Sequence, residues 1–312
     1  MVLSTALLKT PRILSLLQPQ RNSMPPLRLI WRRNLLLVEK ANSLLPNNAQ
    51  RTIPALQNLE WCEACLYRSP IKAVRLSMNL GEETLRRWAD ACNHTGKRAY
   101  VHLPSAAHLP KSHSPHTWRL KRIADWLAAA LLLMCLSPLM LLVAVLIYTD
   151  SPGPIFFRQW RVGHRGKLFQ IIKFRTMRPN AEQLHHQVMG EQPGLHKLAH
   201  DPRITAVGHW LRKYSLDELP QLFNVLRGEM SLVGPRPWAL YDAVRIEPAF
   251  RYRLNALPGV TGAWQVSTRS NEVDISSVSR KDLAYLADWS VLRDLRLLLL
   301  TVPKVISGSG SY

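Results

Sequence analysis

The chain has 312 residues, enough for a sizeable core domain and a smaller second one. Its 41 Lys and Arg residues exceed its 21 Asp and Glu residues, giving a formal net charge of +20 at pH 7. This excess predicts a polyanionic surface or ligand: nucleic acid, anionic lipid or a phosphorylated substrate. No zinc-finger spacing or RNP-type aromatic motif occurs, and the arginines stand singly among apolar residues, so we expect a membrane interface and no nucleic-acid partner.

Residues 1–50 are rich in Leu, Arg, Pro and Asn and are expected to form a leader, either disordered or lying on a membrane surface. Within it, Arg28–Lys40 is basic and leucine-rich. A secretory signal is not expected, because Lys9, Pro11 and Arg12 interrupt the leucine clusters.

Residues 51–103 predict a small α/β module whose role the sequence does not reveal. The patterns favour a β-α-β unit with parallel strands, formed by Ile71–Met78, Gly81–Asn93 and Arg98–Leu103. Its CxxC pair, Cys62 and Cys65, has no second pair downstream and favours incidental thiols over a metal site. The proline- and serine-containing residues 104–118 predict a linker.

Residues 119–150 hold the longest apolar run, Trp126–Tyr148, which has no charged residue. A straight helix of that length would reach about 35 Å and could cross a bilayer. However, Ser137 and Pro138 interrupt the run at its middle, where proline removes a backbone hydrogen bond. Both flanks are also positively charged, which would hold both ends on the cytoplasmic side. We therefore expect a re-entrant helix–break–helix anchor; the alternative is a kinked spanning helix.

Residues 151–312 are expected to form a compact catalytic domain with amphipathic interfacial helices. The fold class is thus mixed α/β (α+β) and membrane-associated. The patterns predict paired strands at Ile155–Arg161 and Leu168–Phe174, and helices at Ala181–Met189 and Leu216–Leu226. The short apolar stretch Leu295–Val305 is expected to be an interfacial or buried helix.

The chemistry concentrates in two neighbouring motifs, LRKYSLDELPQ at Leu211–Gln221 and GEMSLVGPRP at Gly228–Pro237. The first contains the adjacent acids Asp217 and Glu218. Carboxylates supply a nucleophile or bind a divalent metal, and arginines bind phosphate, so together they predict phosphoryl transfer. A second interpretation is structural: Ser215 would cap a helix, with Glu218 completing a capping box.

These motifs resemble those of the bacterial sugar transferase family, the monotopic polyprenyl-phosphate phosphoglycosyl transferases that initiate exopolysaccharide, O-antigen and capsule assembly. The resemblance runs from about Lys121 to Tyr312 through KRIADW, SPGPIFFRQWRVG, FQIIKFRTM, the two motifs above, LPGVTGAWQVSTR and DLRLLLLTVPKV. It does not cover the N-terminal 115 or so residues. The family also carries a Ser-Pro break at this place in its membrane segment, which strengthens the re-entrant prediction.

The resemblance implies an enzyme with a two-step reaction. Asp217 would attack the β-phosphorus of a nucleotide-diphospho-sugar, with UDP-hexose (glucose or galactose) the usual donor, and form an aspartyl phospho-sugar. Polyprenyl phosphate would then take the sugar phosphate. Glu218 would bind Mg²⁺, and Arg212 and Arg236 would bind the phosphates. The implied location is the inner membrane, with the catalytic domain on the cytoplasmic face.

Three further residues have weaker support. Arg175, in KFRTM, is a third candidate for phosphate binding, or it forms a structural salt bridge. Asp282 and Asp294 match acidic positions of the family and would either support the metal or pair with arginines such as Arg293 and Arg296.

Two other classes compete with this interpretation. A non-enzymatic basic membrane scaffold, or an anionic-ligand-binding protein, would explain the charge but not the Asp-Glu pair and the GPRP turn together. A conventional multi-spanning transferase would need several long apolar runs, and the sequence has one. Membrane lipid is an expected partner, and the sequence leaves the formation of a homo-oligomer open.

Overall fold

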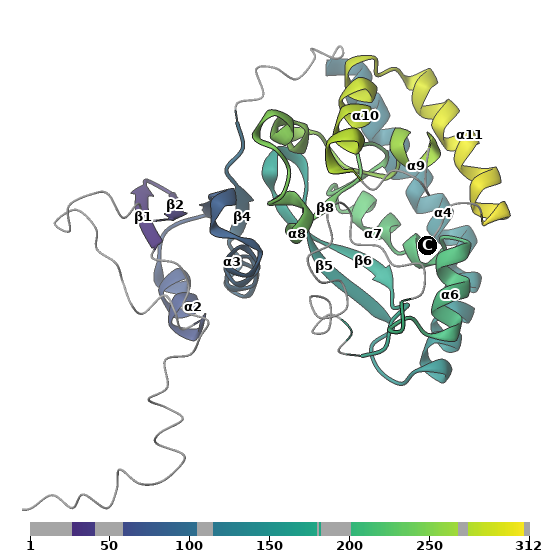
Figure 1. Cartoon of the computed structure of the whole chain (residues 1–312), viewed down its shortest axis with the longest axis horizontal. Helices are drawn as coiled ribbons and strands as arrows, with labels where there is room; N and C mark the ends of the chain where they lie inside the picture. The colour runs from purple at the N-terminus through teal and green to yellow at the C-terminus, as the bar shows by residue number, and fades with distance from the viewer. Residues whose placement is uncertain are drawn as a thin grey trace, which may run out of the picture. The chain divides into compact units, whose positions relative to one another are not determined.

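The computed structural model describes residues 27–40, 59–104, 115–179, 181, 201–267 and 274–308. These residues fall into two compact units, 1–97 and 98–312. Figure 1 shows the elements of both units in chain order by colour.

The first unit contains a β-hairpin where the sequence predicted only a leader. Strands β1 (Leu27–Arg32) and β2 (Leu35–Lys40) pair antiparallel, and β2 pairs in parallel with β3 (Ala73–Leu76). Alternate residues of β2 are buried, the period-two pattern of a half-buried strand. The leucine-rich composition suggested a segment that is disordered or lies on a membrane surface, but the turn between the strands, with Arg33 at a φ of 49°, makes it a hairpin.

Two helices complete the described part of the first unit, α2 (Leu59–Arg68) and α3 (Glu82–His94), with a short 3-10 helix at Met78–Leu80. The predicted strand and helix after residue 70 thus form as β3 and α3. The second predicted strand forms as β4 (Arg98–Val101), which belongs to the second unit.

The second unit is built around the antiparallel hairpin of β5 (Phe156–Val162) and β6 (Leu168–Phe174), both predicted from the sequence. Strand β8 (Trp238–Ala239) pairs with the other side of β5. A second sheet pairs β7 (Ser231–Val233) in parallel with β9 (Gly259–Thr261). The remaining elements are short 3-10 helices at His164–Gly166, Leu216–Glu218 and Pro248–Asn255, and the helices α6 (Ala206–Lys213), α7 (Gln221–Leu226), α8 (Leu240–Ala243), α9 (Ala263–Ser267), α10 (Ile275–Ala287) and α11 (Val291–Ser307).

Helix α7 completes the outer edge of β6 through Asn224, which is fully buried. Its Oδ1 accepts a hydrogen bond from the backbone N–H of Ile172 at 3.0 Å, and its Nδ2 donates to the carbonyl of Gln170 at 2.9 Å. An edge strand exposes unpaired backbone groups, and this amide satisfies two of them. The same contact fixes the chain that precedes α7 beside β6.

The predicted capped helix at Leu216–Leu226 is wrong in its first half. Residues Leu216–Glu218 form a 3-10 turn, and α7 begins only at Gln221, after Pro220. Pro220 has no N–H to bond the carbonyl of Leu216, which interrupts the helical hydrogen bonding at this point. Ser215 has a φ of 53° and makes no side-chain capping bond, so the expected capping box is absent. Of the predicted helix Ala181–Met189, all but Ala181, which lies in a turn, falls outside the described residues.

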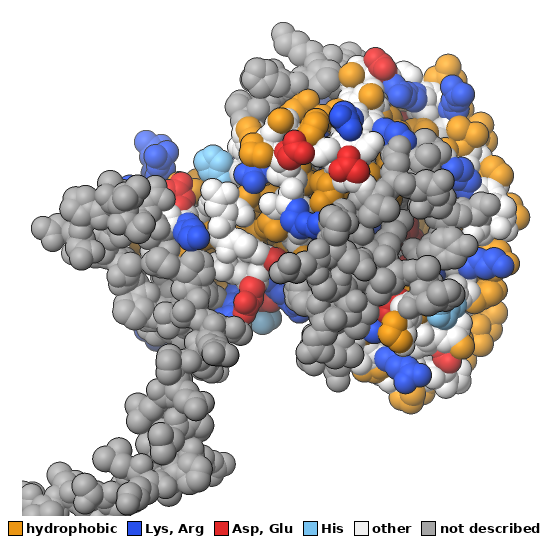
Figure 2. Space-filling view, viewed as in Figure 1, with side chains coloured by type: hydrophobic (Ala, Val, Ile, Leu, Met, Phe, Trp, Pro, Cys, Tyr) orange, Lys and Arg blue, Asp and Glu red, His pale blue; other side chains and the backbone are white. Residues whose placement is uncertain are grey.

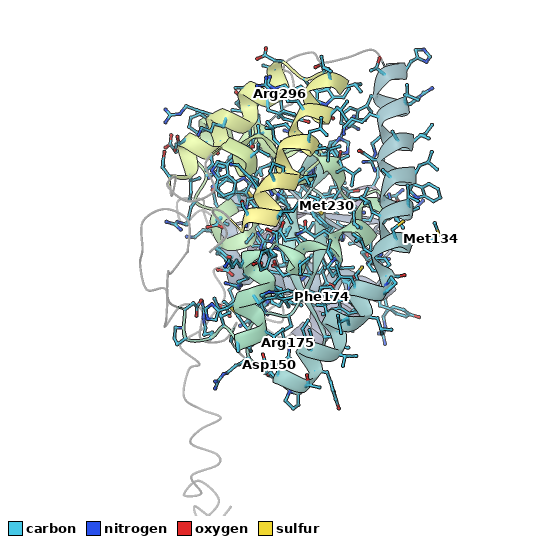
Figure 3. All side chains as sticks on the ribbon, turned by 90° about the vertical axis from the view of Figure 1, so that its right-hand side faces the viewer. Met134, Asp150, Phe174, Arg175, Met230 and Arg296 are labelled. Carbon is cyan, nitrogen blue, oxygen red and sulfur yellow. The ribbon has the colours of Figure 1, made fainter. Side chains whose placement is uncertain are left out.

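The apolar run forms part of a single helix, α4 (Pro115–Asp150), with 36 residues and Pro138 inside it. By length and composition it is the one described helix that could cross a membrane; its most apolar window has a mean hydropathy of 2.8. Helical structure continues through Pro138, and the Ser137 hydroxyl donates to the carbonyl of Met134 at 2.9 Å, as expected for a residue that relieves a proline. Figure 3 shows the helix passing Met134 and turning toward the body of the unit before Asp150. The re-entrant arrangement stays a prediction.

Two apolar clusters join α4 to the sheets and helices beneath it. The first contains Ala129 of α4 together with Phe169, Val225 and Tyr285, and the second contains Val143 and Ile147 with Phe174 and Leu211. The opposite face of α4 is exposed and apolar, as are several positions of α11. Figure 2 shows the hydrophobic side chains along the edge of the second unit where Figure 1 draws these helices. Exposed positions are Trp126, Leu127, Leu131, Met134, Leu141, Leu142, Leu292, Leu295, Leu299 and Ile306.

Candidate active site

The predicted acid pair lies beside a lysine that the sequence analysis did not select. Asp217 and Glu218 come from the 3-10 turn, and Lys173 comes from β6. The Nζ of Lys173 is 2.7 Å from Oε1 of Glu218 and 3.7 Å from Oδ2 of Asp217. The edge contact of Asn224 with β6 explains this meeting, since it holds the turn against the strand. One cation therefore serves both carboxylates.

Asp217 is buried, and burial raises the pKa of its carboxyl above the ordinary range. Lys173 and Arg212 oppose this shift, and the negative charge of Glu218 adds to it. A desolvated carboxylate that keeps its charge is a stronger nucleophile than a hydrated one, since it has little water to shed. Asp217 thus has the environment of a reacting group.

Arg212, in the last turn of α6, lies close enough to Asp217 for their charges to interact. Its Nε donates to Oγ1 of Thr176 at 2.9 Å, which fixes the guanidinium. Burial lowers the pKa of Arg212, and the charges of Asp217 and Asp201 oppose this. The structure therefore brings this predicted phosphate-binding residue to the acid pair.

Arg236 lies in the GPRP turn, which packs tightly against a second loop. A Cβ on Gly259 would lie 2.0 Å from the backbone nitrogen of Gly234, so both positions require glycine. The Gly234 N–H donates to the carbonyl of Thr261, and the Gly259 N–H donates to that of Pro235. The guanidinium of Arg236 lies 5.4 Å from the ring centre of Trp264, a buried residue of α9.

Glu218, Lys173 and Arg236 line one cleft. Arg161, Gln221 and Gln265 line it as well, and sequence reasoning selected none of these three. Gln265 donates from Nε2 to the carbonyl of Val260, and its buried Oε1 has no hydrogen-bond partner within the described part of the chain. The cleft thus combines cations, a carboxylate and an amide oxygen, a set suited to a phosphorylated polar ligand.

Comparison with known proteins supports a specific family. Residues 116–308 match the bacterial sugar transferase family. This chain belongs to that family. The match confirms the resemblance predicted from the motifs and, with it, the assignment as a phosphoglycosyl transferase.

Three relatives illustrate the likeness. The chain is 43% identical over 199 residues to the exopolysaccharide production protein ExoY of Sinorhizobium fredii, covering 62% of this chain and 88% of that protein. It is 44% identical over 200 residues to the UDP-glucose:undecaprenyl-phosphate glucose-1-phosphate transferase of Caulobacter vibrioides, covering 62% and 72%. It is 42% identical over 200 residues to the undecaprenyl-phosphate galactose phosphotransferase of Salmonella typhimurium, where it spans 42% of the relative.

Arg175, the third arginine predicted for the transferase, is not placed with the acid pair. Its guanidinium donates to the carbonyls of Ser151 and Pro152, at the turn after α4. Figure 3 shows Arg175 beside Asp150, at the C-terminal end of that helix. A cation there complements the negative end of the helix dipole, so the contacts support the structural interpretation of Arg175.

The two C-terminal aspartates also lie in ion pairs, but with partners other than Arg293 and Arg296. Asp282 bonds Arg253, and both side chains are 1% exposed. Asp294 is 2.8 Å from Nζ of Lys121 and accepts hydrogen bonds from Tyr285 and Trp289. Each carboxylate thus forms an ion pair within the fold. No contact of the described residues supports a role for either one in metal binding.

The residues that sequence reasoning missed lie on strands and on a distant loop. Lys173 belongs to the KFRTM motif. It could be selected only by knowing that β6 lies beside the turn that carries Asp217 and Glu218. From the sequence, no role was assigned to Arg161. Its pairing with Ala239 of β8, which sets it next to GPRP, depends on strand register.

Proposed function

We propose that this transferase moves a sugar 1-phosphate from a nucleotide-diphospho-sugar, a UDP-hexose, to undecaprenyl phosphate, and so initiates exopolysaccharide or a related glycan. The names of the Caulobacter and Salmonella relatives support the acceptor and the group transferred. The observation that carries the proposal is the buried carboxylate of Asp217 beside Lys173, because Lys173 and Arg236 line the same cleft.

In the first step, a carboxylate oxygen of Asp217 attacks the β-phosphorus of the donor. The bond from that phosphorus to the bridging oxygen breaks, and UMP leaves. Lys173, Arg212 and Arg236 offset the negative charge that builds up on the phosphoryl oxygens. In the second step, a phosphate oxygen of the lipid attacks the same phosphorus and frees the carboxylate of Asp217.

We also propose Mg²⁺ as the cofactor, held by Glu218. Carboxylate oxygens are the ligands that Mg²⁺ prefers, and it is commonly bound by one or two of them, with waters and substrate phosphates. When bound, Mg²⁺ would neutralise charge on the diphosphate.

We infer that α4 is re-entrant and that the catalytic unit lies on the cytoplasmic face of the inner membrane. Both ends of α4 bond to the same unit. Near its start, Lys121 donates to the hydroxyl of Ser231 at 2.8 Å. At its end, Asp150 accepts a hydrogen bond from the backbone N–H of Val207 at 3.2 Å. A helix that crossed the bilayer would have its ends on opposite sides, where one folded unit could not bind both.

Nucleotide release tests the reaction. Full-length protein in membranes is incubated with a panel of UDP-sugars, undecaprenyl phosphate and Mg²⁺. We expect UMP from one or a few donors, released in full only with the lipid and lost on chelation. Release of UDP would mean direct glycosyl transfer and would overturn the aspartyl intermediate.

Asp217→Asn should abolish turnover and leave membrane attachment intact. Asp288→Asn is the matched control, since Asp288 is exposed and remote from the cleft residues. Substantial turnover by Asp217→Asn would remove Asp217 as the nucleophile.

Single cysteines at Arg119 and Arg158, both exposed, test the topology of α4 once the native exposed cysteines are replaced by serine. A membrane-impermeant maleimide added to spheroplasts should label neither position, and added to inverted vesicles it should label both. Labelling of one position in each preparation would show a spanning helix.

A further inference from the structure

Among the described residues of the second unit, one buried arginine, Arg161, has neither the carboxylate partner nor the helix-end carbonyls that the other buried arginines have. Arg253 and Arg203 are buried and each bonds a carboxylate, Asp282 and Asp201 respectively. Arg175 is buried against backbone carbonyls at the end of α4. Arg161 is 8% exposed, and no carboxylate of the described residues lies within salt-bridge distance of it.

The contacts of Arg161 hold its guanidinium at the wall of the cleft. Nη1 donates to the carbonyl of Pro237 at 3.1 Å, and Nη2 donates to Oε1 of Gln159 at 2.6 Å. The Nε–H is buried and has no acceptor in the described part of the chain. The arginine is therefore oriented by two neutral groups and still has unused N–H donors.

Burial makes this arrangement costly. It lowers the pKa of Arg161, and the positive charge of Arg236 adds to this, while Tyr241, Asp242 and Glu218 oppose it. Lys173 lines the same cleft. Three cationic residues, Arg161, Lys173 and Arg236, therefore line the cleft together with Glu218. A buried charge without a partner destabilises a fold unless a ligand supplies the opposite charge.

We propose that Arg161 is a phosphate-binding residue that, with Arg236, holds the diphosphate of the nucleotide-sugar donor. The assignment rests on the proposed function and adds to it a residue outside the LRKYSLDELPQ and GPRP motifs. A diphosphate carries two negative charges on adjacent groups, which two guanidinium groups can share. Because Arg161 bonds the carbonyl next to Arg236, the two cations form one rigid pair.

The test compares UDP with uridine, because only UDP carries the diphosphate. Binding of each is measured by calorimetry on full-length protein in nanodiscs, for wild type, Arg161→Met and Arg161→Lys. The matched control is Arg158→Met, which removes an exposed arginine from the same strand. We expect Arg161→Met to bind UDP about 10- to 100-fold more weakly, the loss typical of one charge-assisted hydrogen bond, with uridine affinity unchanged.

Arg161→Lys should retain part of the UDP affinity, because it keeps the charge and a donor for Pro237. If the methionine variant does not fold, the UDP and uridine affinities of the lysine variant test the proposal instead. A merely structural arginine would lower UDP and uridine affinity together, and that result would overturn the proposal. So would an unchanged donor KM with a raised KM for the lipid phosphate, which would assign Arg161 to the acceptor. Failure of wild type to bind UDP would count against the proposed function itself.

Discussion

The substitution Asp282→Asn separates two roles for this aspartate, an ion pair and a metal ligand. Asp282 and Arg253 are each 1% exposed, and removing one charge of a buried pair typically costs about 3–5 kcal/mol, because the other charge stays buried alone. For a unit of this size, each kcal/mol lowers the melting temperature by roughly 2–4 °C. The expected fall is therefore roughly 6–20 °C.

The assay is a melting curve of purified protein in detergent, followed without and with Mg²⁺. Asp288→Asn is the matched control, because Asp288 pairs with Arg293 at an exposed site, where such pairs contribute about 0–1 kcal/mol. The double variant Arg253→Met with Asp282→Leu should recover much of the loss, since it leaves no buried charge. A melting temperature unchanged by Asp282→Asn, combined with a raised Mg²⁺ requirement, would refute the ion-pair role and restore the metal role.

Three further predictions follow from burial and close contact. Burial raises the pKa of Asp217, so protonation of its carboxyl stabilises the fold fully below about pH 4, and this stabilisation is lost as the pH rises through the raised pKa. Asp217→Asn should therefore have a higher melting temperature than wild type at pH 8 and an equal one at low pH. A lower melting temperature at pH 8 would contradict this. Gly259→Ala should lower kcat/KM for the donor at least about tenfold, because the added Cβ would displace the loop at Gly234. Near-normal kinetics would show instead that the backbone relaxes and that this close approach is dispensable. Burial raises the pKa of Cys62 to about 12, so maleimide at pH 8 should modify exposed Cys65 far faster than Cys62, as read by peptide mass spectrometry.

The sequence alone predicted the candidate motifs and several local elements around them. The strands around Gly163 follow from alternation on either side of a turn-rich segment, and they form with the predicted pairing. That prediction succeeds because it depends on neighbouring residues. The acid pair was predicted because its residue types and spacing point to phosphoryl transfer, and its catalytic role stays a prediction.

What failed depends on conformation or on distant partners. The capping box at Ser215 fits local statistics, but the residue adopts a left-handed conformation, and Pro220 delays the helix. Arg175 is as good a phosphate ligand as Arg161 by composition, and only the fold shows that one bonds the end of α4 and the other lines the cleft. The partners of Asp282 and Asp294 lie 29 residues before the first and far upstream of the second, beyond any periodic pattern.

The two ends of α4 bond to the two segments that carry the proposed phosphate-binding residues Arg236 and Arg212. Lys121, near the start of the helix, bonds Ser231 of β7, and β7 leads directly into the turn that bears Arg236. The last residue of the helix caps the first turn of α6 at Val207, and α6 ends at Arg212 and Lys213. Since a membrane would hold the exposed apolar face of α4 at a fixed depth, these ties would also fix the height of both arginines above the lipid. That coupling gives the buried polar bonds a reason beyond stability, because a lipid phosphate can reach Asp217 only if the cleft stands at the level of the head groups.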